Sequence, residues 1–595
     1  MESVASVIFD SHNEDFRSPQ GAIPCGSAVT LRVLVSKALD AYGVTLRLWE
    51  DEEEQLLNML HGRDYTETPY GAFFEEYTIC VSRETPGPIW YEFVVNTPGK
   101  PLTVCNPADG LGGRADVLDR PVSARSFQLS FVQNTFSVPE WAKGAILYQI
   151  FPDRFFRAPG YGDSAGRKMH ESWQEDPAWQ IDPDKGYYPA DDFFGGNLKG
   201  IEQKLDYLKS LHVDVLYLNP IFAAYSDHRY DTADYEQIDS LLGTQEDLES
   251  LCATAAARGI RVLLDGVFSH TGSDSKYFNR EGRFDTLGAY QSPDSPYYEW
   301  YTFKQFPNEY DCWWGVWSLP CVKEMTPSYL AYMLKNEDAV VKKWLRAGVS
   351  GWRLDVADEL PDAFLKELRQ SVKEEKPDAL ILGEVWEDAS KKISYGARRE
   401  FLYGDELDSV MNYPLRNAIV SFLRQEISGD DFCRVVLSLR ENYPEESFFC
   451  LMNFLSTHDL ERITTRLAVS AETMTREEQA YLTLTDEQRQ IALGLHKLAV
   501  LLVFALPGMP SIYYGDEAGV EGAKDPFNRK PYPWGRENNG LLEWYRTVAA
   551  LRDDVMKRGS LYLDTAGSLL SVRRRLDVQW RYVLLNVSDE TAETL

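Results

Sequence analysis

The sequence predicts an α/β protein: a (β/α)8 TIM barrel with an N-terminal β-sandwich, an inserted lobe after the third barrel strand and a short C-terminal β domain. Three observations lead to this prediction. The chain has 595 residues, well beyond the roughly 250–300 at which a single core stops growing. From about Gly144 onward, near-continuous apolar runs alternate with helical patterns, which is typical of a parallel sheet. Eight such runs are present, the number that closes this barrel.

Residues 1–130 are expected to form the β-sandwich. The runs VTLRVLVSKALDAYGVTLRLWED (29–51) and PIWYEFVVNT (88–97) alternate between apolar and polar residues and are separated by turn residues, which is the pattern of short sandwich strands. Residues 131–143 are then a linker, and the barrel is placed at 144–556.

Strand and helix signals follow one another through the barrel region. LKGIEQKLDYLKSLH (198–212) carries apolar residues at helical spacing, and QEDLESLCATAAARG (245–259) ends on a glycine, a common helix stop. The eight expected strands are AILYQIF (145–151), VDVLYLNP (213–220), IRVLLDGVF (260–268), GWRLDV (351–356), ALILGEV (379–385), SVMNYP (409–414), FFCLMNFLSTHD (448–459) and PSIYYGDE (510–517).

Two further segments complete the predicted architecture. Residues 271–327 are rich in Tyr, Pro and Asp and lack periodicity; a loop this long inside a domain is usually functional. We expect them to form a lobe over the carboxyl ends of the strands. Residues 557–595 contain SLYLDTAG, LLSVRRRL and WRYVLLNVS, about three strands of a short C-terminal β domain.

Charge and composition limit the partners. The formal net charge of −31 argues against nucleic acid and anionic membranes, whereas a neutral polymer is indifferent to it. No apolar run approaches the roughly 18 residues of a membrane span, and the N-terminus has no basic and apolar leader. Eight cysteines without CxxC spacing indicate free thiols. We therefore expect a cytoplasmic protein.

Charged and titratable residues stand at the ends of four predicted strands, where the active sites of such barrels lie. Any one of them has an ordinary structural explanation, such as a helix N-cap for an Asp or a buried ion pair for Arg353 with Asp355. Their convergence on one rim favours a site. The residues are Asp265 and His270, Arg353 and Asp355, Glu384, and His458 and Asp459.

Three carboxylates without a nucleophilic Ser or Cys constellation suit cleavage of a glycosidic bond. One carboxylate can attack the anomeric carbon while another protonates the leaving oxygen. Arg353 beside Asp355 would keep the attacking group ionised. No metal site is predicted, because HExxH-type spacing is lacking and the arginine would repel a cation.

The motifs DGVFSH, GWRLDVADE, GEVW and FLSTHD resemble, in order, those of the alpha-amylase family of glycoside hydrolases. The resemblance implies a retaining double displacement with Asp355 as nucleophile, Glu384 as general acid/base and Asp459 as the third carboxylate. It also implies that His270, Arg353 and His458 line the same subsite.

Other segments narrow the resemblance. HRYDT (228–232), DPFNRKPYPW (525–534), VADE after the nucleophile and the N-terminal β domain are similar to the neopullulanase, cyclomaltodextrinase and maltogenic amylase group, whereas LPCVKEM (319–325) resembles amylase–pullulanase relatives. By this resemblance Tyr230 stacks on the sugar near His228, and Trp386 faces the leaving-group side. Rim packing is the alternative for both aromatic residues. Asp525 and Arg529 would hold sugars on the non-reducing side.

Three departures concern calcium, which some members of the family bind. Ser269 stands where the first motif usually has Asn, the stretch after the first strand is FFRAPGYGDSAG (155–166), and Asn197 replaces the Asp of a GGD motif. No cofactor is therefore expected to be required; calcium stays an option whose usual ligands are depleted.

The expected activity is hydrolysis of alpha-glucosidic bonds in alpha-glucans: pullulan to panose, starch, maltooligosaccharides and cyclodextrins. A transglycosylase using the same site and a catalytically silent glucan-binding protein are the alternatives. The sandwich is starch-binding-like by resemblance, although Trp90, Tyr91 and Phe93 fit core positions equally well. Related enzymes dimerise through this domain, so a homodimer is expected, and sedimentation as a monomer at micromolar concentration would exclude it.

Overall fold

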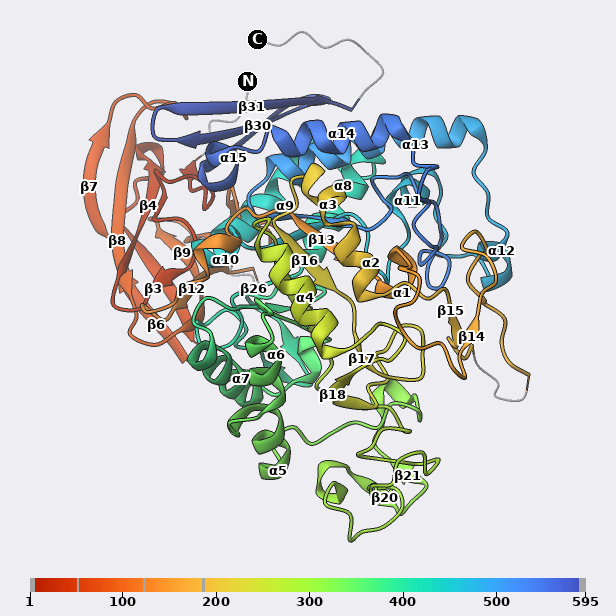
Figure 1. Ribbon diagram of the computed structural model, residues 1–595. Helices are drawn as coiled ribbons and strands as arrows, with labels where there is room; N and C mark the ends of the chain where they lie inside the picture. Colours follow the sequence, from red (N-terminus) through yellow and green to blue (C-terminus); the bar gives the residue numbers. More distant parts are fainter. Residues whose placement is uncertain (1–5, 51–52, 121–124, 184–187, 588–595) are drawn as a thin grey trace. The chain divides into compact units, whose positions relative to one another are not determined.

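The computed structural model describes residues 6–50, 53–120, 125–183 and 188–587, and the chain divides into two compact units (Figure 1). The first unit contains Met1–Ser137, Glu387–Glu406 and Ile427–Phe448. The second contains Val138–Trp386, Leu407–Glu426 and Phe449–Leu595. Two segments from the middle of the chain therefore belong with the N-terminal region, which the sequence patterns do not predict.

The first unit holds two β-sheets around one apolar core. Alternate residues of their strands are buried, and Phe9, Tyr91, Phe93 and Phe127 pack edge-to-face or stacked in this core. One sheet contains β1 (Val7–Ile8), β2 (Arg17–Ser18), β4 (Ala28–Ser36), β7 (Leu60–Tyr65) and β8 (Phe74–Ser82). The other contains β3 (Ile23–Pro24), β5 (Gly43–Glu50), β6 (Glu53–Asn58), β9 (Gly87–Asn96), β10 (Leu102–Cys105), β11 (Asp116–Leu118) and β12 (Phe127–Val132).

The later segments of the first unit are a hairpin and two helices. The hairpin is β24 (Ile393–Ser394) with β25 (Ala397–Arg398), and the helices are α9 (Gly429–Asn442) and α10 (Glu445–Phe448). Arg17 is fully buried, and its Nη1 lies 2.7 Å from Oε1 of Glu441 on α9. A buried pair of this kind loses stability when one partner is removed, so it holds α9 against the sandwich.

The second unit is built on eight parallel strands that are buried except at Arg261, the first residue of β19, as expected for a sheet covered on both faces. A parallel bridge between Met411 and Met452 joins the two ends of the sheet and closes the barrel. The strands are β13 (Leu147–Ile150), β16 (Val215–Leu218), β19 (Arg261–Gly266), β22 (Gly351–Leu354), β23 (Leu380–Gly383), β26 (Ser409–Val410), β27 (Met452–Phe454) and β28 (Met509–Tyr513).

Helices follow most of these strands. Thr244 and Asp247 form a capping box that starts α4, as such residues commonly do. The single helix predicted over 198–212 is wrong in one respect: Lys204 leaves helical geometry and divides it into two. The helices are α1 (Pro152–Phe155), α2 (Leu198–Gln203), α3 (Leu205–Ser210), α4 (Gln245–Ala256), α5 (Pro327–Leu330), α6 (Val340–Arg346), α7 (Asp362–Glu375), α8 (Tyr413–Leu423), α11 (Ile463–Ala468), α12 (Arg476–Ala480), α13 (Asp486–Ala505), α14 (Asn539–Ala550) and α15 (Asp554–Arg558).

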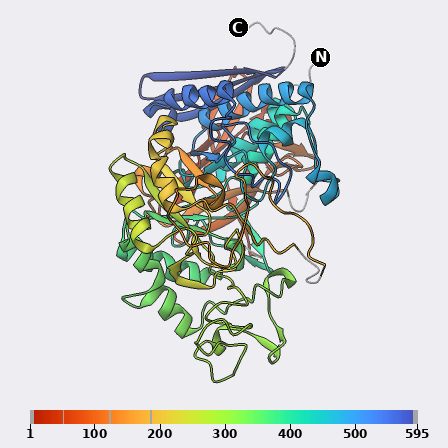
Figure 2. The same ribbon diagram turned by 45° about the vertical axis from the view of Figure 1, so that its right-hand side comes forward.

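The lobe and the terminal sheet stand at opposite ends of the second unit (Figures 1 and 2). The lobe contains the short hairpin of β20 (Phe303–Gln305) and β21 (Glu309–Tyr310), with long irregular connections. The terminal sheet is antiparallel and is formed by β29 (Ser560–Ala566), β30 (Leu569–Leu576) and β31 (Gln579–Asn586).

The predicted fold class is confirmed. All eight predicted barrel strands form, the N-terminal sheets precede them, and an antiparallel sheet follows them. The exact domain boundaries stay predictions, and the end of the expected C-terminal domain, 588–595, lies outside the described residues. Among the described residues, no helix is long and apolar enough to cross a bilayer.

Candidate active site

One buried arginine lies at the centre of the candidate site. Arg353, on β22, is fully buried and its Nη1 donates to Oδ1 of Asp265 and to Oδ1 of Asp355, at 2.9 Å each. Its Nη2 lies 2.8 Å from Oε2 of Glu384. The ends of β19, β22 and β23 thus meet at one guanidinium, the side chain best suited to hold several carboxylates.

The backbone around Asp355 is shaped by close contacts. Gly351 begins β22 with φ of +150°, and a Cβ there would lie 2.2 Å from the carbonyl oxygen of Leu380. Only glycine therefore lets β22 and β23 pair this closely. Directly after Asp355, Val356 adopts φ of +37°, and its N–H donates to Oε2 of Glu384 at 2.9 Å. The turn that ends β22 therefore helps to fix Glu384.

Two tyrosines orient Asp265 on the far side of the arginine. The hydroxyls of Tyr217 and Tyr230 donate to its Oδ2 at 2.5 and 2.9 Å. Asn219 donates to the hydroxyl of Tyr230 at 3.0 Å. Asp265 thus uses both carboxylate oxygens within the protein, so its role is to position Arg353 and Tyr230.

His458 and Tyr230 form a stacked pair. Their rings are parallel within 8°, with centroids 5.2 Å apart. Gln149 donates to Nδ1 of His458 at 3.0 Å, which leaves Nε2 as the protonated nitrogen. That nitrogen lies 2.7 Å from the Tyr230 hydroxyl and 3.1 Å from Oδ2 of Asp459. Burial holds the pKa of His458 well below its ordinary value, so it acts as a neutral donor.

His228 and His270 are also neutral donors. Burial lowers the pKa of His228 to about 3 and that of His270 to about 4. The Tyr230 N–H donates to Nδ1 of His228 at 3.1 Å, so the proton of His228 is on Nε2. Nε2 of His270 lies 3.2 Å from the Tyr230 carbonyl oxygen, which only accepts. His270 therefore fixes the backbone of Tyr230.

Glu384 is approached by two aromatic donors. Trp386 Nε1 donates to its Oε1 at 3.1 Å and the Tyr413 hydroxyl does so at 3.2 Å. The two rings are stacked, with centroids 4.4 Å apart and an angle of 16°. Trp386 nevertheless remains 45% exposed. It thus presents an aromatic face to solvent beside the carboxyl group.

Asp459 lies on the side of His458 and Arg529. Arg529 Nη2 is 3.6 Å from its Oδ1, and Nη1 of the same guanidinium is 2.9 Å from Oδ1 of Asp525. Burial and repulsion from Glu384 raise the pKa of Asp459 to about 7. Arg529 therefore orients two carboxylates at this edge.

The crowded carboxylates cannot all be ionised together. Burial raises the pKa of Asp355 well above its ordinary value; Arg353 opposes this, and Glu384 adds to it. Such groups titrate as a set, and one excess proton is what a site needs if one carboxyl is to act as acid while another attacks.

All twelve site residues predicted from the sequence lie in the second unit, and hydrogen bonds or ion pairs link them into one network. The sequence motifs do not include four further residues of the site region, Tyr217, Tyr413, Trp313 and Trp314. Tyr217 and Tyr413 lie within predicted strands and have no motif signal. Trp313 stacks on Trp314 at 5.4 Å and packs 5.7 Å from the His270 ring; the tandem tryptophans in the lobe were the available signal.

Trp314 is held in an unusual conformation. It has φ of +46°, is 76% exposed, and donates from Nε1 to Oε1 of Glu359 at 3.0 Å. Glu359 belongs to the same 3-10 turn that follows Asp355. A bulky exposed residue in this backbone region is typical of binding sites.

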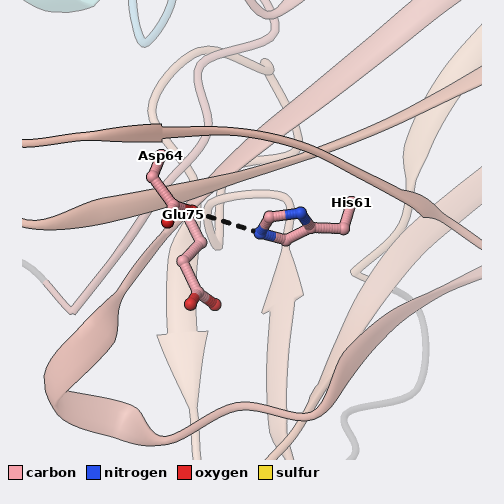
Figure 3. A group of neighbouring side chains, drawn as sticks. All are labelled: His61, Asp64 and Glu75. Atoms are coloured by element: carbon pink, nitrogen blue, oxygen red, sulfur yellow. Dashed lines mark ion pairs between the residues drawn. The ribbon is translucent and has the colours of Figure 1, made fainter.

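Two groups of potential metal-ligating side chains occur in the described part of the chain, and neither contains a residue of the network above. One is His61, Asp64 and Glu75 on β7 and β8 (Figure 3). Its Asp64 is 3.3 Å from His61 Nε2 and 2.6 Å from Lys37 Nζ. The lysine already supplies a positive charge there. The other group is Glu400, Asp405 and Glu406.

These features define a class of protein. A closed barrel of eight parallel strands with carboxylates, an arginine and neutral histidines at the carboxyl ends of its strands is a (β/α)8 glycoside hydrolase. The family model described as alpha amylase, catalytic domain, matches residues 149–558. The chain belongs to this family, the alpha-amylase family of glycoside hydrolases.

Named relatives agree with the predicted group. An amylopullulanase of Thermoanaerobacterium saccharolyticum is 36% identical over 596 residues, which cover 93% of this chain and 45% of that protein. Neopullulanase 2 of Thermoactinomyces vulgaris is 34% identical, with 79% of this chain and 74% of that protein covered. A solved cyclomaltodextrinase structure aligns with a TM-score of 0.67 and 29% identity, over 96% of this chain and 90% of that one. The chain thus spans less than half the length of the amylopullulanase.

Replacing Asp459 with Asn should stabilise the fold at neutral pH. In the folded chain the carboxyl group of Asp459 keeps its proton up to a pKa of about 7, whereas an Asp in the unfolded chain loses its proton near pH 4. The stability that the group contributes is therefore present below about pH 4 and is lost as the pH rises to about 7. Asn does not ionise, so Asp459→Asn should unfold roughly 2 °C or more above the parent at pH 8, with the difference vanishing near pH 4. Thermal unfolding across this range measures it.

The matched control is Asp525→Asn, which removes the other carboxylate paired with Arg529. A rise in unfolding temperature for Asp459→Asn that does not depend on pH would contradict the raised pKa of Asp459. An equal rise in Asp525→Asn would contradict it as well.

Proposed function

We propose that this chain hydrolyses alpha-glucosidic bonds in alpha-glucans with retention of configuration, using Asp355, Glu384 and Asp459. The observation that carries the proposal is that Asp355 and Glu384 flank the two terminal nitrogens of one buried guanidinium, that of Arg353. This arrangement allows an ionised carboxylate and a protonated carboxyl group of the protein to act together on one substrate molecule.

In the first step, Asp355 attacks the anomeric carbon. Arg353 holds Oδ1 of Asp355 at 2.9 Å, so Oδ2 is the attacking oxygen. Glu384 gives its proton to the glycosidic oxygen as the carbon–oxygen bond breaks, and the leaving sugar departs as an alcohol. The product is a glycosyl ester of Asp355 and an ionised Glu384.

In the second step, water replaces the leaving sugar. Glu384, now a carboxylate, takes a proton from the water, whose oxygen attacks the anomeric carbon and releases Asp355. Val356 N–H, Trp386 and Tyr413 remain hydrogen-bonded to Glu384. They keep it in one orientation for both proton transfers.

The remaining groups act on the sugar ring between the two steps. The ring carries positive charge in the transition state, which the carboxylate of Asp459 favours electrostatically. The aromatic face of Tyr230, fixed by His458 and His270, would stack on the ring. The Nε2 proton of His228 is a donor for a sugar hydroxyl.

The substrates follow from the relatives. Their names include amylopullulanase, neopullulanase and cyclomaltodextrinase, which supports pullulan, starch, maltooligosaccharides and cyclodextrins as substrates here, with panose as the product from pullulan. A homodimer through the N-terminal domain and a cytoplasmic location stay predictions from the sequence.

Transglycosylation is the second candidate activity. The exposed face of Trp386, stacked on Tyr413 and bonded to Glu384, can hold an acceptor sugar where water would otherwise enter. The same intermediate then passes to a sugar hydroxyl. A silent glucan-binding protein is disfavoured by the complete set of three carboxylates.

Product analysis on pullulan tests the leading proposal. The chain should release panose, and Asp355→Asn should lower kcat by more than about 10³-fold, because the amide is a poor nucleophile. Cleavage of starch or cyclodextrin without cleavage of pullulan would be consistent with the mechanism but would contradict the proposal that pullulan is a substrate. Inactivity on all three would favour the silent alternative.

Trp386→Ala should shift the balance from transfer toward hydrolysis. Loss of the aromatic face weakens acceptor binding, so the ratio of transfer to hydrolysis products from maltotriose should fall several-fold. The lost hydrogen bond to Glu384 slows the formation of both products alike, so its effect cancels in this ratio. Trp314→Ala is the control, because that indole is also exposed but bonds Glu359. Equal shifts in both variants would count against a specific acceptor role for Trp386.

We further propose that calcium is not needed near the first barrel strand. Asn197 Nδ2 donates to the carbonyl oxygens of Ala158 and Tyr161, at 3.1 and 3.2 Å, and its Oδ1 accepts from Gly200 N at 2.8 Å. Backbone carbonyl oxygens are common calcium ligands. Here two of them instead accept hydrogen bonds from the side-chain amide of Asn197. The residues present therefore do not fit the ion.

Asn197→Asp tests this substitution. The carboxylate would face two carbonyl oxygens without a donor, which costs roughly 1–3 kcal/mol, and added calcium should restore the lost stability. Melting temperatures with calcium and with chelator should differ in this variant and coincide in the parent. A parent whose melting temperature falls in chelator would refute the proposal.

A further inference from the structure

The larger sheet of the first unit carries a cavity of about 750 Å³. Trp49 on β5, Trp90 on β9 and Gln128 on β12 line it in one row, because the three strands pair in this register. The hairpin of β24 and β25 contributes Ile393 and Arg398 to its wall. These residues lie outside the candidate active site, and the volume is within the roughly 300–1,000 Å³ of small-molecule sites.

The alternation of side chains along β9 separates the cavity from the core. Tyr91 and Phe93 are completely buried between the sheets, whereas Trp90 alternates with them and lines the cavity. Of these three aromatic residues, Tyr91 and Phe93 therefore belong to the core. Trp90 is half-buried and faces a space that a ligand can enter.

The wall of the cavity is electropositive, although the chain as a whole has a formal net charge of −31. Four basic and two acidic side chains line it: Arg47, Arg125, Lys391 and Arg398, and Glu92 and Glu441. Asp116 and Asp388, which pair with Arg125 and Lys391, do not line the cavity. Their guanidinium and ammonium groups thus lie between these acids and the cavity wall.

Both acidic side chains of the wall are neutralised by their neighbours. Glu92 Oε1 accepts from Arg47 Nη1 at 2.7 Å. Glu441 Oε1 lies 2.7 Å from Arg17 Nη1, and its Oε2 accepts from the Ser11 hydroxyl at 2.9 Å. A cleft lined mainly by one sign of charge attracts ligands of the opposite sign, so this cavity favours an anion.

Arg398 is the cation that is available to such an anion. Its Cζ lies 4.4 Å from the centroid of the Trp90 ring, and no carboxylate of the described residues forms an ion pair with it. The contact with the indole holds the guanidinium in place. A guanidinium can donate two parallel N–H groups to a phosphate, so a charged group and a ring can be bound side by side here.

Gln128 adds a requirement for a hydrogen-bond donor. Its side chain is 5% exposed, and within the described part of the chain its Oε1 accepts no hydrogen bond. The orientation of the amide is fixed, because Ser390 donates its hydroxyl to Asp388 and therefore accepts from Gln128 Nε2 at 3.1 Å. A buried acceptor is costly unless a donor reaches it, so the ligand must supply an N–H or O–H group.

A nucleoside monophosphate has all the required groups. Its base is a flat ring that stacks on aromatic side chains, its phosphate is an anion, and its ribose hydroxyls and base amino groups are donors. One phosphate carries about two negative charges at neutral pH, far fewer than the nucleic acid polymer against which the net charge of the chain argues. A neutral sugar would leave the free cation unused, and an inorganic anion would leave the tryptophans unused.

We propose that this cavity binds a nucleoside monophosphate. The base lies against Trp49 and Trp90, the phosphate binds Arg398, and a hydroxyl or amino group donates to Gln128 Oε1. The inference rests on the cavity alone and does not depend on the proposed activity.

Calorimetric titration of the full chain with AMP tests the proposal. One molecule should bind per chain. Adenosine lacks the phosphate and ribose 5-phosphate lacks the base, so each should bind about tenfold or more weakly than AMP. This comparison uses the unmodified chain, so it tests the proposal even if a variant fails to fold.

Arg398→Ala should lower the preference for AMP over adenosine about tenfold, because only AMP uses the guanidinium. Arg398→Lys keeps the charge and should restore part of the preference. Arg63→Ala is the matched control: Arg63 also lies over an aromatic ring of the same sandwich, that of Tyr65 at 5.3 Å, but it does not line the cavity. It should bind AMP as the parent does.

Three results would overturn the proposal. They are the absence of AMP binding at millimolar concentration, equal binding of AMP and adenosine, and a loss of AMP binding in Arg63→Ala equal to that in Arg398→Ala. A competition experiment separates the cavity from the candidate active site. Excess maltotriose should leave AMP binding unchanged in Asp355→Asn, where the sugar is not consumed, and displacement of AMP would also count against the proposal.

Discussion

The contact of one guanidinium with three carboxylates is the interaction on which the rest of the candidate site depends. Arg353 is completely buried and meets Asp265, Asp355 and Glu384 from three neighbouring strands. Removing a charge from such a group leaves the others uncompensated, which typically costs about 3–5 kcal/mol. The same cation limits how many of the carboxylates can ionise. One side chain therefore affects both the positions of the carboxylates and the number of protons that they hold.

Neutral donors surround this charged centre and are ordered in one direction. Gln149 donates to His458, whose Nε2 lies beside the Tyr230 hydroxyl, and that hydroxyl donates to Asp265. The position of each proton in this series of hydrogen bonds follows from Gln149, whose Nε2 can only donate to His458. Chains of this kind polarise one another. Because the histidines stay neutral, the network orients groups without adding positive charge that would compete with Arg353 for the carboxylates.

The barrel and the carboxylates of the candidate site were predictable because they are local signals. A buried strand is an apolar run, and a charge at its end breaks that run, so Asp355, Glu384 and Asp459 were visible in the sequence. Arg353 and His458 were visible in the same motifs, but other members of the network were not. Tyr217 lies inside an apolar strand and meets Asp265 only because β16 and β19 pair in register. Trp314 reaches Glu359 across 45 residues through a backbone conformation with no sequence mark. Contacts made by pairing or by irregular loops depend on the whole fold.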